Sequence, residues 1–173
     1  MSKLCQDSSE NLLDGSLTYG IDGIDGVGKT TLANTLAELT GFKVIHLDDY
    51  VDRNRDGYVA HLKIDQLQHD VIESDTFIIE GVCLLSILKR LDVVVDNHIY
   101  IKRLSHGLWA DEHECEIASD VEEFILRERE AIGLLSDAPF MPELPGLAEE
   151  LIRYHHEFNP HSTADTVFFR NDA

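Results

Sequence analysis

Positive charge is scarce in this sequence of 173 residues, in which 14 lysines and arginines are set against 33 aspartates and glutamates, giving a net charge of −19 at pH 7. A surface this acidic repels the backbone of DNA or RNA, because phosphate contacts supply most non-specific affinity for nucleic acids. We therefore expect no nucleic-acid partner. We interpret the acidity as a solubility feature, and any nucleotide site must be locally positive or carry a metal ion.

Long apolar runs and closely spaced cysteines are also absent. No stretch of about 18 apolar residues occurs, so we expect no membrane-spanning helix and no membrane partner. Cys5, Cys83 and Cys115 lie far apart and form no CxxC pair, which favours free thiols and a cytoplasmic location. Residues 1–15 lack the apolar core of a signal peptide, so we expect a flexible arm there and a single domain over residues 16–173. The oligomeric state is left open.

The apolar share of 43% is enough for a core, and short apolar segments alternate with helical ones. The predicted strands cover residues 17–22, 43–47, 76–81, 97–102 and 166–169. Helical periodicity covers residues 29–40, 121–132 and 146–158, with Gly41 and Pro160 as stops. Strands separated by helices indicate right-handed crossovers. The pattern therefore predicts an α/β fold with three layers (αβα), in which helices cover both faces of a five-stranded parallel sheet.

One segment, GIDGVGKTT at residues 23–31, fits the phosphate-loop pattern G-x-x-x-x-G-K-[ST] at every fixed position. A predicted strand precedes it and a predicted helix follows, as in phosphate-loop (P-loop) NTPases. Glycines let the backbone wrap a phosphate, and the helix adds its positive end. Lys29 should reach the β- and γ-phosphates of ATP, and the Thr30 hydroxyl should ligate Mg²⁺. The residues expected to bind the nucleotide are Gly23, Asp25, Gly26, Val27, Gly28, Lys29, Thr30 and Thr31.

Carboxylates follow two of the other predicted strands, at the sheet edge where ligands bind in such folds. Asp48 and Asp49 end the second strand, so one could take a proton from an acceptor hydroxyl while the other orders the water around Mg²⁺. Glu80 ends the third strand, the usual place of a carboxylate near Mg²⁺. The alternatives are a solvated acidic turn for the aspartates and a strand-end cap for Glu80.

Taken together, GIDGVGKTT, HLDDY, IIEGV and EFNPHSTADTVF resemble, in order and spacing, the uridine kinase-like family of P-loop kinases, over residues 17–169. That family includes uridine–cytidine, nicotinamide riboside, pantothenate and phosphoribulo-kinases. The resemblance implies an ATP- and Mg²⁺-dependent kinase acting on a hydroxyl of a small, nucleoside-like molecule. It implies that Asp48 is the general base, that Glu80 is the Walker-B-type acid and that Tyr50 lies near the acceptor. Pro160 and Asp165 match a segment near the adenine end.

The sequence departs from that family in two segments. The acceptor-binding segment is trimmed, although Arg53 and Tyr58 within it could contact an acceptor. The lid, expected around residues 103–145, lacks the family's arginine-rich motif. Arg127 and Arg129 either clamp the transferred phosphoryl group or pair with glutamates on a helix surface. Lys102 and Arg103 are the other cations at the lid.

These departures keep two other functions open. A P-loop ATPase or nucleotide-binding module would need no small-molecule acceptor. A nucleoside monophosphate kinase would need arginines for an acceptor phosphate. Elsewhere in the chain, we interpret His155, His156 and His161 as a polar helix face and cap. Trp109 either packs in the lid or stacks on a ring of the ligand.

Overall fold

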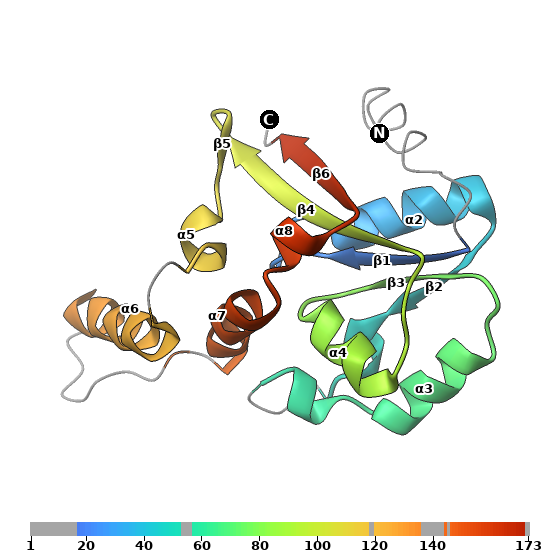
Figure 1. Ribbon diagram of the computed structural model, residues 1–173, viewed down its shortest axis with the longest axis horizontal. Coiled ribbons are helices and arrows are strands. Elements are labelled where there is room, and N and C mark those ends of the chain that lie inside the picture. Colours follow the sequence, from blue (N-terminus) through green and yellow to red (C-terminus); the bar gives the residue numbers. More distant parts are fainter. Residues whose placement is uncertain (1–16, 53–56, 118–119, 136–143, 145, 172–173) are drawn as a thin grey trace.

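The computed structural model describes residues 17–52, 57–117, 120–135, 144 and 146–171 (Figure 1). The predicted N-terminal arm lies outside this part of the chain. The strands are β1 (Thr18–Asp22), β2 (Lys43–His46), β3 (Phe77–Glu80), β4 (Asn97–Ser105), β5 (Leu108–Trp109) and β6 (Thr166–Asn171). The α-helices are α2 (Lys29–Thr40), α3 (Ile64–Ile72), α4 (Leu84–Leu91), α5 (Glu112–Cys115), α6 (Val121–Leu135), α7 (Gly146–Phe158) and α8 (Pro160–Thr163). Two 3₁₀ helices, η1 (Leu47–Tyr50) and η2 (Val59–His61), complete the set.

Five parallel strands form the sheet in the order β2–β3–β1–β4–β6, and the short β5 adds an antiparallel hairpin to β4. The predicted α/β fold with a five-stranded parallel sheet is confirmed. Strand β5 was not predicted from the sequence. Because β1 lies at the centre, the loop that follows it opens at the middle of the carboxyl edge, where parallel sheets bind their ligands.

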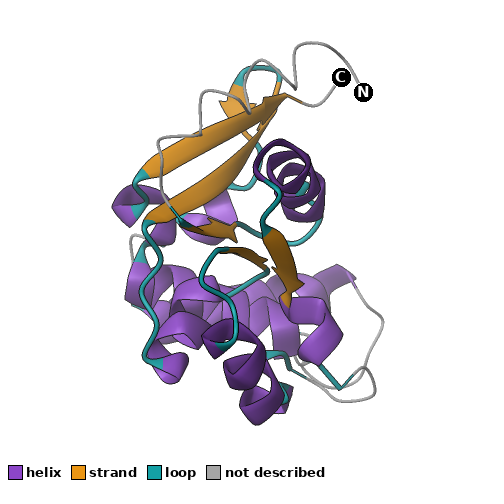
Figure 2. Cartoon of the chain, turned by 90° about the vertical axis from the view of Figure 1, so that its right-hand side faces the viewer, coloured by secondary structure: helices purple, strands orange, loops and turns teal. Residues whose placement is uncertain are grey.

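Helices cover both faces of the sheet (Figures 1 and 2). Apolar residues of α2 pack against inward-facing residues of β1 and β4 on one face. Residues of α3 and α4 pack on the other face, where α7 adds Leu147 and Leu151. Successive residues of β3 divide between the two cores, with Ile78 in the first and Ile79 in the second, as a strand buried on both faces requires. Helix α6 lies beside α7, away from the strands (Figure 1).

Some predicted helix ends agree with the structure, and one differs. Gly41 ends α2 in the left-handed conformation, with φ 76°, as predicted. Pro160 was expected to end the helix before it, but α7 ends at Phe158 and Pro160 instead begins α8. The turn between these two helices is made by Asn159, whose φ is 47°. Proline suits the first turn of a helix because its missing N–H would have no partner there.

Helices α3, α4 and α5 were not predicted. The sequence also predicts a loop at residues 136–146, which hold three of the four prolines, and most of these residues lie outside the described part of the chain. No helix within the described residues is long and apolar enough to cross a membrane.

Candidate functional site

The phosphate loop, residues 23–30, joins the end of β1 directly to the start of α2. Gly26 and Gly28 have φ values of 74° and 98°, conformations that residues with a Cβ rarely adopt. A Cβ added to Gly26 would meet nothing within 4 Å, so the loop is open at this point. The loop therefore leaves its backbone and the amino end of α2 open to a ligand, as an anion-binding loop should.

The side chain of Lys29 folds back into the loop. Its Nζ donates a hydrogen bond of 2.6 Å to the carbonyl oxygen of Ile24, and the residue is only 7% exposed. Burial lowers the pKa of Lys29, while the negative charges of Asp22 and Glu80 act in the opposite direction. The ammonium group is thus held within a loop that has the shape to receive a phosphate.

Glu80 connects the phosphate loop to the neighbouring strand. Its Oε1 accepts a hydrogen bond of 3.0 Å from the hydroxyl of Thr30 and lies 2.7 Å from Nδ1 of His46. Register explains the second contact, because His46 of β2 pairs directly with Glu80 of β3. Thr30 and Glu80, both predicted as metal-site residues, are therefore hydrogen-bonded to each other in the structure. His46, which was not predicted, is the third residue of this hydrogen-bonded group.

Asp48 follows β2 and is fixed by a tyrosine from the next segment. The Tyr58 hydroxyl donates a hydrogen bond of 2.7 Å to Oδ1 of Asp48. Burial raises the pKa of Tyr58, and the bond to Asp48 adds to this, so the phenol stays protonated and remains a donor. Glu150 of α7 holds the tyrosine in turn, because its Oε2 accepts a bond of 2.6 Å from the backbone N–H of Tyr58.

A close approach at Gly81 brings Asp48 toward Glu80. A Cβ at Gly81 would lie 2.7 Å from the Cβ of Leu47, the residue before Asp48. Real Cβ atoms almost never come this close, so only glycine lets η1 pack against the end of β3. Gly81, which follows Glu80 in the segment IIEGV, thus has a packing role, while the predicted role of Glu80 toward a metal stays a prediction.

Beneath the loop, the carboxylate of Asp22 is fully buried at the end of β1. It accepts hydrogen bonds from its neighbour, the Gly23 N–H, at 2.7 Å and from the Tyr154 hydroxyl of α7. Nε2 of His98 lies 3.4 Å away without forming a hydrogen bond. The Tyr154 oxygen also accepts a bond of 3.1 Å from the Leu85 N–H, so one phenol links α7, α4 and the phosphate loop.

These elements enclose one cavity of about 530 Å³. Its walls are Asp25, Gly26, Gly28, Lys29, Thr30, Thr31, Asp48, Tyr58, Glu80, Val82, Leu147 and Arg170. The predicted nucleotide loop, the predicted base and the predicted metal carboxylate thus border a single space. The volume falls within the range of small-molecule sites in proteins.

Arg170 of β6 is a lining residue that the sequence analysis did not identify. Its Nη1 donates a hydrogen bond of 3.1 Å to the carbonyl oxygen of Gly26. The sequence held one signal for Arg170. It comes directly after an apolar predicted strand, and residues in that position lie at the sheet edge where ligands bind, the reason for which Asp48 and Glu80 were predicted.

The structure places the predicted lid cations elsewhere. Arg127 pairs with Glu123 one turn away on α6, and Arg129 pairs with Glu149 of α7 at 2.6 Å. The Arg127 contact is a pair within one helix surface, the alternative that we gave above, whereas Arg129 binds a glutamate of another helix, which was not predicted. A role for either arginine in phosphoryl transfer remains a prediction.

The two cations of β4 are also held by neighbours in the structure. Nη2 of Arg103 lies 2.5 Å from a carboxylate oxygen of the buried Asp111. Nζ of Lys102 lies 3.7 Å from the ring centre of Trp109, which packs near Tyr100 in the same hairpin region. The packing alternative for Trp109 therefore matches its surroundings.

Two further predicted site residues within the described part of the chain, Asp49 and Tyr50, are not among those that line the cavity. Asp49 is exposed on η1, next to Asp48. Tyr50 is buried, and its hydroxyl donates a hydrogen bond of 2.5 Å to Asp70 of α3. Arg53 lies outside the described residues. Their predicted roles toward metal and acceptor therefore stay predictions.

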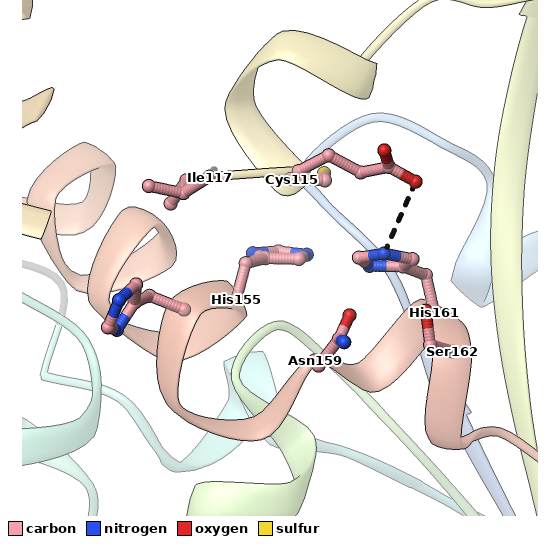
Figure 3. Close-up of a pocket in the computed structure, with 8 residues that line it drawn as sticks. Cys115, Ile117, His155, Asn159, His161 and Ser162 are labelled. Atoms are coloured by element: carbon pink, nitrogen blue, oxygen red, sulfur yellow. Dashed lines mark ion pairs between the residues drawn. The ribbon is translucent and has the colours of Figure 1, made fainter. Parts of the chain in front are cut away.

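A second cavity, of about 390 Å³, lies between α5, α7 and α8, with His155 and His161 side by side in its wall (Figure 3). Both rings are buried rather than part of a polar face, and only His156 is exposed. Burial lowers the pKa of His155, and it lowers the pKa of His161 to about 4. Within the described residues, no three His, Cys, Asp or Glu side chains are grouped so that they could hold a metal ion.

No protein-family model and no curated protein matches this sequence. Among solved structures, the chain is similar to a possible uridine kinase from Bacillus stearothermophilus, at 19% identity and a TM-score of 0.51, covering 95% of this chain and 96% of that one. It is also similar to shikimate kinase from Acinetobacter baumannii, at 13% identity and a TM-score of 0.46, covering 95% and 89%. The first likeness shows a P-loop kinase fold.

Proposed function

We propose that this protein is an ATP-dependent kinase that transfers the γ-phosphoryl group of ATP to a hydroxyl of a small, nucleoside-like molecule. One observation carries the proposal: Asp48 borders the same cavity as Lys29 and Thr30 of the phosphate loop. A phosphoryl donor bound by the loop and an acceptor alcohol beside Asp48 would therefore share one space, as direct transfer requires.

The phosphate loop fits a nucleoside triphosphate. Its glycines leave room for phosphate oxygens beside the backbone, and Lys29 supplies positive charge from within the loop. Bringing the ammonium from the Ile24 carbonyl to a phosphate oxygen would exchange a neutral acceptor for a charged one, which strengthens the hydrogen bond. Lys29 would then stabilise the charge on the phosphoryl group as it moves.

The Thr30 hydroxyl and the Glu80 carboxylate fit Mg²⁺, which prefers oxygen ligands and commonly uses only one or two protein groups beside phosphate and water. When bound, the ion would neutralise charge on the phosphates. His46 would keep Glu80 in place from the neighbouring strand.

Asp48 would act on the acceptor. Its Oδ1 is held by Tyr58, which fixes the direction of the carboxylate, and the group would accept the proton of the attacking hydroxyl. Tyr58, Val82 and Leu147 add apolar surface to the cavity wall, which suits an organic acceptor better than water alone. The resemblance to uridine kinase-like enzymes adds nucleosides and related alcohols as first candidates.

The test is Mg²⁺-dependent release of ADP from ATP across a panel of nucleosides, nicotinamide riboside, pantothenate, shikimate and nucleoside monophosphates, with an acceptor-free control. Strong stimulation by one alcohol would support the kinase and identify its substrate. ADP release that no acceptor stimulates would favour the ATPase, and stimulation only by a monophosphate would favour the monophosphate kinase.

Substitution of neighbouring aspartates separates their predicted roles. Asp48→Asn should lower kcat by about 10²- to 10⁴-fold, the usual contribution of a general base, and leave the Kd for ATP unchanged. Asp49→Asn has the same change of charge one residue away, and it should weaken Mg²⁺ dependence if Asp49 helps to order the metal. Unchanged turnover in Asp48→Asn would remove this residue from the mechanism.

A further inference from the structure

Arg170 lies against the phosphate loop although it is far from it in sequence. A Cβ built on Gly28 would be 3.0 Å from Nη1 and 3.5 Å from Cδ of Arg170, so the arginine passes directly over the residue that precedes α2. The hydrogen bond from Nη1 to the Gly26 carbonyl oxygen holds the guanidinium beside the loop. It also borders the cavity that Lys29 and Thr30 border.

The charges around this cavity need a second cation. Asp25, Asp48 and Glu80 contribute carboxylates to its wall, whereas Lys29 and Arg170 contribute the positive charge. ATP would add several negative charges in a chain whose net charge is −19. Lys29 and a bound Mg²⁺ would together bring three positive charges, which three wall carboxylates already equal, so the charge of the ATP phosphates would still need a partner.

The position of Arg170 is set by the sheet rather than by a lid. Arg170 of β6 pairs in register with Arg103 of β4, which binds Asp111. The residue thus extends from the carboxyl edge of the sheet and is exposed to solvent, where a ligand can reach it. A phosphate oxygen would offer the guanidinium a charge-assisted bond, about twice as strong as a bond to a neutral carbonyl such as that of Gly26.

We propose that Arg170, from the last strand, binds the phosphates of the nucleotide and supplies the positive charge that was predicted for arginines of the lid. The planar guanidinium has five donors and suits phosphate oxygens, two of which it can contact at once. This inference rests on the proposed function in one respect, that the loop binds a nucleoside triphosphate.

The test measures binding of ATP and of inorganic tripolyphosphate by calorimetry to the full chain and to Arg170→Gln and Arg170→Lys. Tripolyphosphate is the essential probe because it has the phosphates without the base and ribose. Lys43→Gln is the matched control: it also removes one positive charge, but Lys43 is exposed at the amino end of β2, the opposite edge of the sheet. Circular dichroism checks that each variant is folded.

We expect Arg170→Gln to weaken both ligands about 10- to 100-fold, the effect of one lost hydrogen bond to a charged group. Arg170→Lys should lose less affinity for both ligands. Lys43→Gln should keep a Kd within about twofold of the wild type, because the charge that it removes is distant from the loop and screened. If Arg170→Gln binds tripolyphosphate as the wild type does, the proposal is wrong, even where ATP binding falls, since the contact would then be to base or ribose. If the wild type itself binds neither ligand, the proposed function fails instead.

Discussion

The hydroxyl of Tyr58 donates a hydrogen bond of 2.7 Å to the carboxylate of Asp48, and both side chains border the cavity of the phosphate loop. The tyrosine is held from behind by Glu150 of α7, so a helix that is distant in sequence determines where Asp48 points. Three predictions concern contacts at or beneath this cavity, and a fourth concerns His161 in the wall of the second cavity.

Removing the Tyr58 hydroxyl should impair chemistry without impairing nucleotide binding. In Tyr58→Phe, Asp48 loses a hydrogen bond to a charged group and its carboxylate is free to turn away from the acceptor. We expect kcat with the best acceptor to fall about tenfold, while the Kd for ATP stays the same. Steady-state kinetics with ATP titration measures both. An unchanged kcat would show that Asp48 does not depend on Tyr58 for its position.

Adding one methyl group at Gly81 should destabilise the fold at the site. The new Cβ would overlap Leu47 and push η1 from the end of β3, at a cost of about 1–3 kcal/mol in the free energy of unfolding. Urea denaturation measures this change. Gly41→Ala provides a contrast, because Gly41 has positive φ but open space around it, and strain alone should cost about 1 kcal/mol. Wild-type stability in Gly81→Ala would contradict the packing role of Gly81.

Tyr154→Phe should weaken the support beneath the phosphate loop. The substitution removes the phenol that donates to the buried Asp22 and accepts from the Leu85 N–H. Leaving a buried carboxylate with fewer donors costs about 1–3 kcal/mol. We expect this loss in chemical denaturation, with weaker ATP binding as a secondary effect. If the variant is as stable as the wild type, the link between α7 and the loop contributes little to folding.

Acid should destabilise the protein through His161. Its pKa is lowered to about 4 in the folded protein, chiefly by burial and then by the charge of Lys102 and His155, from about 6.5 when unfolded. Glu116, 3.7 Å away, opposes this shift only in part. Between pH 6.5 and 4 the unfolded chain therefore binds more protons, so this part of the stability is present above pH 6.5 and is lost as the pH falls toward 4.

The comparison with His161→Gln isolates this effect from the titration of the many acidic groups. We expect the wild type to lose roughly 1 kcal/mol more than the variant between pH 7 and pH 5, or a few degrees in Tm. Thermal denaturation at the two pH values measures the difference. Parallel changes in the two proteins would show that His161 titrates normally in the folded state.

Much of the fold and the nucleotide loop could be predicted because the determining residues are close together in sequence. The phosphate loop needs glycines, a lysine and a threonine within eight positions, and a strand and a helix on either side of it. Apolar segments of strand length, separated by helices, imply a parallel sheet by geometry alone. The carboxyl edge of that sheet then indicated Asp48 and Glu80.

The lid could not be predicted in the same way. Arg127 and Arg129 are the residue type that could clamp a phosphoryl group. Whether such arginines bind a ligand or neighbouring glutamates depends also on which helix packs beside them. In the structure α7 lies beside α6 and supplies Glu149 to Arg129. The pairing of Arg127 with Glu123 four positions away is a local pattern, but the contact of Arg129 with Glu149 is not.

The sequence by itself determined the P-loop fold, the loop that would hold phosphates and the carboxylates beside it, because each depends on neighbours in the chain or on the period of a strand or helix. Only the tertiary structure decided how the loop is supported and which cation lies over it. Tyr154 reaches Asp22 across 132 positions, and Arg170 reaches Gly26 across 144. Such contacts arise when strands and helices pack in three dimensions, and their partners have no fixed spacing in the sequence.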